Sequence, residues 1–201
     1  NTKFPKADIV IGGPPCQPFS VNGKQLGLKD SRDGFPIFIN SVKQLKPKVF
    51  VFENVRGMMY RNKQYLGEII YTLEKLGYLI HTRILNAKNY SVPQNRERLF
   101  VVGTKSDYYF PSKHVKIFTA GDAISDIAFE IDKDDIFLNS NQDKYIAKYE
   151  KASNCVTPRD LHLDRPARTL TCRNLAGATG DMHRVKLPDG RRKRLNINDN
   201  N

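Results

Sequence analysis

A cysteine stands on a stiff turn directly after a short run of β-branched residues. In Gly12-Gly13-Pro14-Pro15-Cys16, two glycines permit a tight turn and two prolines restrict the backbone that follows. A thiol presented in this way becomes a nucleophile if its surroundings lower its pKa from about 8.5. Alternatively, Cys16 is a buried, unreactive residue of the core. The turn by itself does not distinguish a nucleophile from a structural cysteine.

Two more groups of polar residues adjoin apolar runs. Glu53, in the run 53–55, directly follows the apolar run 49–52, where a partly desolvated carboxyl can hold or donate a proton. Arg96 and Arg98 directly precede the apolar run 99–103, and strand alternation would send both to one side. A guanidinium offers a fork of donors for carbonyl or phosphate oxygens. Alternatively, Glu53 only caps the turn that follows it, and Arg96 and Arg98 only form a solvated basic strand edge.

The elements that must position these residues alternate along the first part of the chain. The runs 8–13, 49–52, 78–85 and 99–103 read as strands, and apolar residues recur at helical spacing over 37–45 and 62–76. This alternation predicts an α/β fold with parallel strands, which bind ligands outside their carboxyl ends. We therefore expect Cys16 and Glu53 to converge on one cleft.

The character of the sequence changes after residue 104. Residues 105–165 mix charges and aromatic residues with weak periodicity, a strand-like run follows at 168–171, and a basic run stands at 191–194. We expect two portions, 1–104 and 105–201. The basic run is either a solvated face or a phosphate contact, and the second reading predicts salt-sensitive binding.

The composition favours a polyanionic partner. The chain has 201 residues, with 33 Lys and Arg against 21 Asp and Glu, a net charge of +12. A binding site for nucleic acid would explain this positive charge. A generally Lys-rich proteome would explain it without any such function. No apolar run approaches the ~20 residues of a membrane span, so we expect no membrane contact. Three cysteines without metal-ligand spacing predict reduced thiols in the cytoplasm and no metal site.

In this order, the three motifs resemble those of the cytosine-C5 DNA methyltransferase family. The run 12–20 resembles its nucleophile motif, 53–55 its Glu-Asn-Val motif and 94–98 its Gln-x-Arg-x-Arg motif. The loop 23–34 is similar to the family's mobile loop over DNA, and residues 105–165 stand where its variable target-recognition segment lies. The resemblance implies part of a Rossmann-like methyltransferase sheet with a smaller, irregular target-recognition sub-domain.

The resemblance also implies an activity and a set of site residues. It implies methylation of cytosine C5 in double-stranded DNA by S-adenosylmethionine, through a covalent cysteine adduct on a flipped-out base, in a restriction–modification system. The catalytic residues would be Cys16, Glu53, Arg96 and Arg98, and Pro15 would contact the methyl donor. Contacts with DNA would come from Gln17, Ser20, Lys24, Gln25, Arg191 and Arg192.

The sequence also departs from the family pattern. The family's glycine-rich cofactor loop and its C-terminal motifs are expected outside residues 1–201, in adjoining segments or a partner chain. A DNA-binding subunit that needs such a partner is therefore one alternative. An RNA cytosine methyltransferase is another, although the Cys-Phe-Thr signature of the tRNA-directed branch is not found. A cysteine hydrolase is a distant alternative, because no histidine stands at a recognisable partner position.

Overall fold

A computed structural model describes residues 5–15, 33–133, 135–152, 154, 160–171 and 183–195 of the chain. Contacts divide the chain into two compact units, Asn1–Asn86 with Glu97–Ser112, and Ala87–Arg96 with Lys113–Asn201. The short segment 87–96 thus belongs with the second unit. The assignment of 1–104 to catalysis and 105–201 to target recognition stays a prediction.

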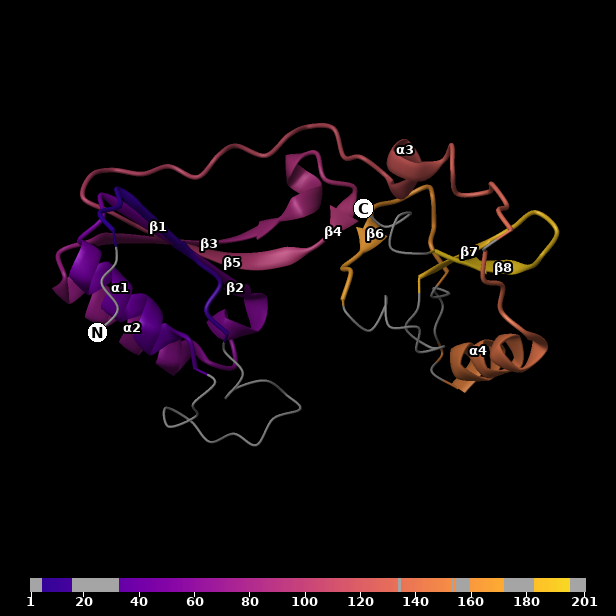
Figure 1. Cartoon of the computed structure of the whole chain (residues 1–201), viewed down its shortest axis with the longest axis horizontal. Coiled ribbons are helices and arrows are strands. Elements are labelled where there is room, and N and C mark those ends of the chain that lie inside the picture. Colours follow the sequence, from indigo (N-terminus) through magenta and orange to yellow (C-terminus); the bar gives the residue numbers. More distant parts are fainter. Residues whose placement is uncertain are drawn as a thin grey trace. The chain divides into compact units, whose positions relative to one another are not determined.

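The first unit is built on a four-stranded sheet. Its strands are β1 (Ile9–Gly12), β2 (Val49–Val55), β5 (Glu97–Thr104) and β3 (Leu79–Asn86), in the order β1-β2-β5-β3 (Figure 1). Strands β1 and β2 pair in parallel, as the sequence predicts, whereas β5 is antiparallel to both β2 and β3. The α/β class is confirmed, with one antiparallel strand inserted.

The direction of β5 follows from the connection that precedes it. Only residues 87–96 separate β3 from β5, and they hold the 3-10 helix η4 (Ala87–Tyr90) and the short strand β4 (Gln94–Asn95). A parallel neighbour needs a crossover of a dozen or more residues, whereas an antiparallel one needs only a turn. The sheet is therefore mixed, with β5 as its antiparallel strand.

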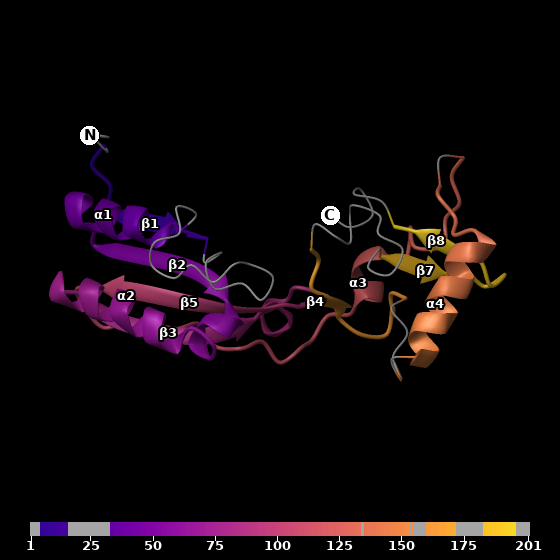
Figure 2. The same cartoon turned by 90° about the horizontal axis from the view of Figure 1, so that it is seen from below.

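Two helices cover one face of the sheet. Helix α1 (Phe35–Leu45) connects β1 to β2, and α2 (Lys63–Lys75) follows the 3-10 helix η3 (Arg56–Met59) and leads to β3 (Figures 1 and 2). Both helices match the predicted ranges closely. Gly77, at φ +82°, ends the turn after α2 in the left-handed conformation that glycine adopts most readily.

Aromatic rings form the core between the helices and the sheet. Phe35 of α1 meets Phe52 of β2 edge to face at 5.2 Å, and Phe38 meets Phe50 at 5.9 Å. These four rings are almost wholly buried. The core thus lies under the inward-facing residues of β2, so alternation turns Glu53 to the opposite face.

The opposite face is partly covered by the segment that follows β5 (Figure 1). Tyr108 packs beside His81 of β3 at 5.6 Å, and the guanidinium of Arg83 lies 4.8 Å from the ring of Phe110. Ile9 and Ile11 of the edge strand β1 remain 56% and 77% exposed. Among the described residues, no helix combines the length and apolar character that crossing a bilayer requires.

The second unit has less regular structure. It holds helices α3 (Ala120–Ile124) and α4 (Ser140–Ala152), a parallel pair of β4 with β6 (Ala167–Arg168), and the hairpin of β7 (Arg184–Lys186) with β8 (Arg192–Arg194). The strand expected over 168–171 is therefore limited to β6. A small apolar core forms around Val185, Leu187 and Leu195.

Candidate active site

An ion pair joins two of the predicted site residues on the first unit. The Nε atom of Arg98 lies 2.8 Å from Oε1 of Glu53. In the antiparallel pairing of β2 with β5, Arg98 stands opposite Val55, two positions from Glu53, so both side chains project from the same face. Their side chains are 20% and 35% exposed. The pair is therefore accessible from solvent yet fixed in direction.

A second ion pair supports the first. Arg56, at the start of η3, pairs with the carboxylate of Glu97 at the start of β5. A hydrogen bond from the Arg56 guanidinium to Glu97 raises the pKa of Arg56 above its ordinary value. The backbone C=O of Glu97 also accepts a hydrogen bond from Nη1 of Arg98 at 2.8 Å. Sequence reasoning missed Arg56 and Glu97, although Glu97 stands between the two quoted arginines.

Asn54 connects the end of β2 to the turn that leads into Cys16. Its side-chain amide donates a hydrogen bond to the backbone C=O of Pro14 at 2.9 Å, and its Oδ1 accepts from the N–H of Val55 at 2.8 Å. Asn54 is 5% exposed, on the core side of the sheet. The first two motifs are thus in direct contact, with Glu53 beside the connecting residue.

Gly34, the N-cap of α1, lies against the same turn. The N–H of Gly34 donates to the C=O of Pro15 at 3.3 Å. A Cβ on Gly34 would lie 2.5 Å from Cδ of Pro15, so only glycine permits this close approach. The carboxylate of Asp33 accepts from the N–H of Phe35 at 3.0 Å and from the phenol of Tyr65. Sequence reasoning did not single out Asp33 or Tyr65.

Several predicted site residues lie outside the described residues: Cys16, Gln17, Ser20, Lys24 and Gln25. Pro15 is described and exposed at the end of the turn. Arg96 lies between β4 and β5 and belongs to the second unit, whereas Arg98 belongs to the first. Strand alternation therefore does not put Arg96 on the side of Arg98, because β5 begins only at Glu97.

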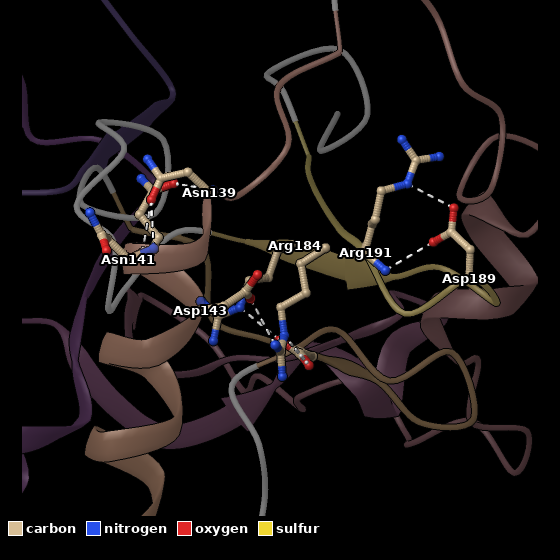
Figure 3. Close-up of polar contacts among 9 residues, drawn as sticks. Asn139, Asn141, Asp143, Arg184, Asp189 and Arg191 are labelled. Carbon is tan, nitrogen blue, oxygen red and sulfur yellow. Dashed lines mark hydrogen bonds and ion pairs between the residues drawn. The ribbon is translucent and has the colours of Figure 1, made fainter.

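The arginines predicted to contact DNA from the basic run each pair with a carboxylate. Arg191 lies 2.7 Å from Asp189, and its backbone N–H and guanidinium hydrogen bonds to that carboxylate lower the pKa of Asp189 (Figure 3). Arg192 lies 2.9 Å from Asp143 and 3.0 Å from Asp160. Burial alone would lower the pKa of Arg192, but hydrogen bonds to these two carboxylates outweigh it and raise the value.

The rest of this cluster is buried. Arg184, 1% exposed, pairs with Asp160 at 2.6 Å (Figure 3). Lys193, 3% exposed, donates to the C=O of Glu130 at 2.6 Å. The interpretation of the run 191–194 as a wholly solvated basic face is therefore wrong, because strand β8 turns the Lys193 side chain inward. The contacts of Arg191 and Arg192 with DNA stay a prediction.

The described ranges offer no place where three His, Cys, Asp or Glu side chains gather around a metal ion. The candidate site on the first unit consists of the Glu53 carboxylate, its partner Arg98 and the turn that precedes Cys16. Such a set can orient a planar ring by hydrogen bonds and hold or move a proton at a ring nitrogen. Cys16 follows this turn in the sequence but lies outside the described residues.

Comparisons with known proteins point in the same direction. Residues 1–169 match the model of the C-5 cytosine-specific DNA methylase family. The chain is 54% identical over 192 residues to the Type II methyltransferase M.AplI of Arthrospira platensis, covering 94% of this chain and 56% of that protein. It is 44% identical over 126 residues to the Type II methyltransferase M.XorII of Xanthomonas oryzae pv. oryzae, covering 60% and 30%.

The fold comparison agrees. The crystal structure of the S. pombe Dnmt2 methyltransferase is similar at a TM-score of 0.59 and 17% identity, covering 89% of this chain and 56% of that one. At this identity the similarity concerns the fold alone. The chain spans just over half the length of the M.AplI protein that it matches.

Proposed function

Because the chain belongs to the C-5 cytosine-specific DNA methylase family, we propose that it transfers a methyl group from S-adenosylmethionine to C5 of cytosine in double-stranded DNA. The observation that carries the proposal is the ion pair of Glu53 with Arg98, beside the anchored turn that leads into Cys16. The Type II designation of its relatives supports a role in a restriction–modification system. We assign this activity to the cytoplasm.

Cytosine C5 is a poor nucleophile, and covalent catalysis overcomes this. The Cys16 thiolate adds to C6 of the ring, forming an S–C6 bond and moving electron density to C5. After C5 is methylated, loss of its proton restores the double bond and expels the Cys16 thiolate. Cys16 follows Pro15 directly, so the hydrogen bond from Asn54 to Pro14 anchors the chain two residues before it.

Glu53 and Arg98 hold the ring during this addition. Glu53 contacts the exocyclic amine and holds or donates a proton at N3, so that negative charge does not accumulate on the ring. Arg98 donates to O2, and its ion pair with Glu53 fixes the carboxylate in direction. Arg96 supports the site from the segment before β5. The two paired side chains recognise one edge of the base together.

The ring atoms involved cannot be reached inside a duplex, so the target base must leave the stack, at a cost of a few kcal/mol. Basic and polar residues hold the opened DNA. We assign this role to Gln17, Ser20, Lys24, Gln25, Arg191 and Arg192. Arg192 would have to exchange at least one of its carboxylate contacts for a phosphate.

The carboxyl ends of β1 and β2 fit a methyl donor site. Ligands of open α/β sheets bind outside the carboxyl ends of such strands. Among the described residues, a Cβ built on Gly13 would meet nothing within 4 Å, so the backbone after β1 is open to a ligand. We assign Pro15, exposed at this end, to the donor site. S-adenosylmethionine supplies an electrophilic methyl group when bound.

A trapping experiment tests the proposal. Duplexes that carry 5-fluorocytosine are incubated with the chain and S-adenosylmethionine, and covalent complexes are resolved on a denaturing gel. Because fluorine at C5 cannot leave as a proton, the Cys16 adduct persists. We expect a band for the wild-type chain and for Cys172→Ser, and none for Cys16→Ala, with DNA binding retained in all three.

Two results would contradict the proposal. A band that persists in Cys16→Ala would show that another group is the nucleophile. No band with the wild-type chain, together with salt-sensitive DNA binding, would favour a DNA-binding portion that needs another polypeptide to hold the donor.

A further inference from the structure

Three exposed lysines form a row along one face of α4 in the second unit. Lys144, Lys148 and Lys151 are spaced i, i+4 and i+7 on this helix. At about 100° per residue, the lysine row lies within an arc of about 60°. Ile146, which is 2% exposed, stands about 160° from the centre of that arc. The lysine row is therefore on the side of α4 opposite to the one that packs into the unit.

The carboxylates of α4 lie away from the lysine row. Asp143 pairs with Arg192 of β8 at 2.9 Å, and Oε1 of Glu150 is shielded from solvent. By helical spacing, both carboxylates stand nearer to the side of Ile146 than to the lysine row. Within the described part of the chain, none of the three lysines forms an ion pair. The row thus presents three positive charges to solvent with no neutralising partner there.

The stability of α4 does not account for this arrangement. Neighbouring like charges on a helix face are destabilising, and Lys148 has one such neighbour on each side, Lys144 and Lys151. Only Lys151 stands in the last turn, where a cation interacts favourably with the helix dipole. Glutamine at these positions would keep the helix and remove the repulsion. The lysine row therefore destabilises the free helix, and a polyanion bound along it would offset that effect.

We propose that the lysine row of α4 binds the phosphate backbone of duplex DNA. The inference rests on the proposed function, which makes DNA the substrate, and it adds contacts that the sequence motifs did not indicate. Seven residues of helix rise about 10.5 Å. One strand of duplex DNA carries a phosphate every ~3.4 Å along the axis, so the row spans about three consecutive phosphates. Each ammonium can meet a phosphate as a point charge.

The surface around the lysine row favours DNA over a lipid surface. A helix that lies in a membrane interface buries large apolar side chains beside its lysines. On α4, Tyr145 is the exposed large side chain of this kind, and Ile146 is turned into the unit. Ala147, between the lysines, leaves room for a close approach. The net charge of +12 adds long-range attraction to a polyanion.

Two variants of the full chain change the lysine row itself. K144Q/K148Q/K151Q removes three charges and keeps good helix formers, and K144R/K148R/K151R keeps the charges. Affinity for a duplex of arbitrary sequence is measured by fluorescence anisotropy between about 50 and 200 mM salt. The Tm of each variant and its binding to vesicles that contain phosphatidylserine are measured alongside.

A third variant controls for net charge. K43Q/K63Q/K75Q removes the same number of charges from exposed lysines of α1 and α2 in the first unit. A general loss of positive charge would weaken DNA binding equally in this variant and in the glutamine variant of the lysine row. A local contact would not.

We expect the glutamine variant of the row to bind DNA at least about fivefold more weakly at the lower salt. The slope of log K against log salt falls by about 2–3, because three phosphate contacts are lost. The loss is the same for different duplex sequences, since phosphates carry no sequence information. The arginine variant keeps the wild-type affinity and slope. The Tm of the glutamine variant equals or exceeds that of the wild type, because repulsion is relieved.

Several results would overturn the inference. One is a wild-type salt slope in the glutamine variant of the row, and another is an equal fall in the charge control. A lower Tm would show that the lysines stabilise α4 instead. A loss confined to the phosphatidylserine vesicles would assign the row to a lipid surface. The proposed function is decided separately by trapping: a chain that binds DNA through the row but forms no covalent adduct would contradict that function and leave this inference standing.

Discussion

Asp160 lies between two arginines of the second unit, and replacing it with asparagine should destabilise that unit. It is paired with Arg184 at 2.6 Å and with Arg192 at 3.0 Å, and the Arg184 side chain is 1% exposed. Asp160→Asn keeps the size of the side chain but removes its charge and one acceptor oxygen. The substitution thus isolates the electrostatic part of the contact.

The magnitude follows from burial. Removing one partner of a buried ion pair costs about 3–5 kcal/mol, because the remaining charge has lost its counterion away from water. The asparagine oxygen still accepts one hydrogen bond, and Arg184 has further contacts, so we expect the lower end, about 3 kcal/mol. A local opening equilibrium would then shift by about 100-fold.

Amide exchange measures this locally. We expect the N–H groups of β7 and β8 to exchange about 100-fold faster in Asp160→Asn at pH 7, while the strands of the first unit keep their protection. Asp189→Asn is the control, because its partner Arg191 is half exposed and solvent screens that pair. Little change is expected there.

A rise of less than about fivefold in β7 and β8 would refute this reasoning, since it would place the pair in the range of surface salt bridges. Arg184 and Arg192 would then be held by packing rather than by Asp160. An equal rise in the control variant would also contradict it, because the effect would no longer follow burial.

Two further predictions concern packing and pH. Gly103→Ala should lower the free energy of unfolding in urea by about 1–3 kcal/mol, because a Cβ there would lie 2.1 Å from the ring of Phe50. The control is Gly67→Ala, which should not be destabilising because a Cβ there meets open space among the described residues. Wild-type stability in Gly103→Ala would show that the ring can move aside. Hydrogen bonds from the Thr119 N–H and hydroxyl lower the pKa of Asp122, so its contribution to stability is present at neutral pH and is lost as pH falls below about 4. The difference in Tm between wild type and Asp122→Asn should therefore shrink in acid, and a constant difference down to pH ~2 would contradict the assignment.

Much of the first unit could be predicted because its signals are local. The β-branched runs of β1 and β2, the helical spacing in α1 and α2, and the glycine at position 77 each report a short stretch of backbone. The parallel pairing of β1 with β2 follows from the helix between them. The sequence pattern did not predict the antiparallel direction of β5 or the short length of β6. Both depend on connections and pairing partners, which periodicity does not describe.

The candidate site divides in the same way. Residue types and spacing singled out Glu53, Arg98 and Cys16 as groups that could do chemistry, because each adjoins an apolar run. They did not reveal that Arg98 would bond Glu53 at 2.8 Å, since that contact depends on the register of β2 with β5.

The supporting contacts were decided by tertiary structure alone. Asn54 with Pro14, Tyr65 with Asp33, and Asp160 with two arginines each join residues far apart in the chain. No local pattern encodes such partners, because a buried donor or acceptor takes whichever group the packing brings within reach. The sequence by itself therefore determined which residues can react and which elements carry them. Folding determined which side chains orient them, because burial makes an unmatched polar group costly and so selects the partners.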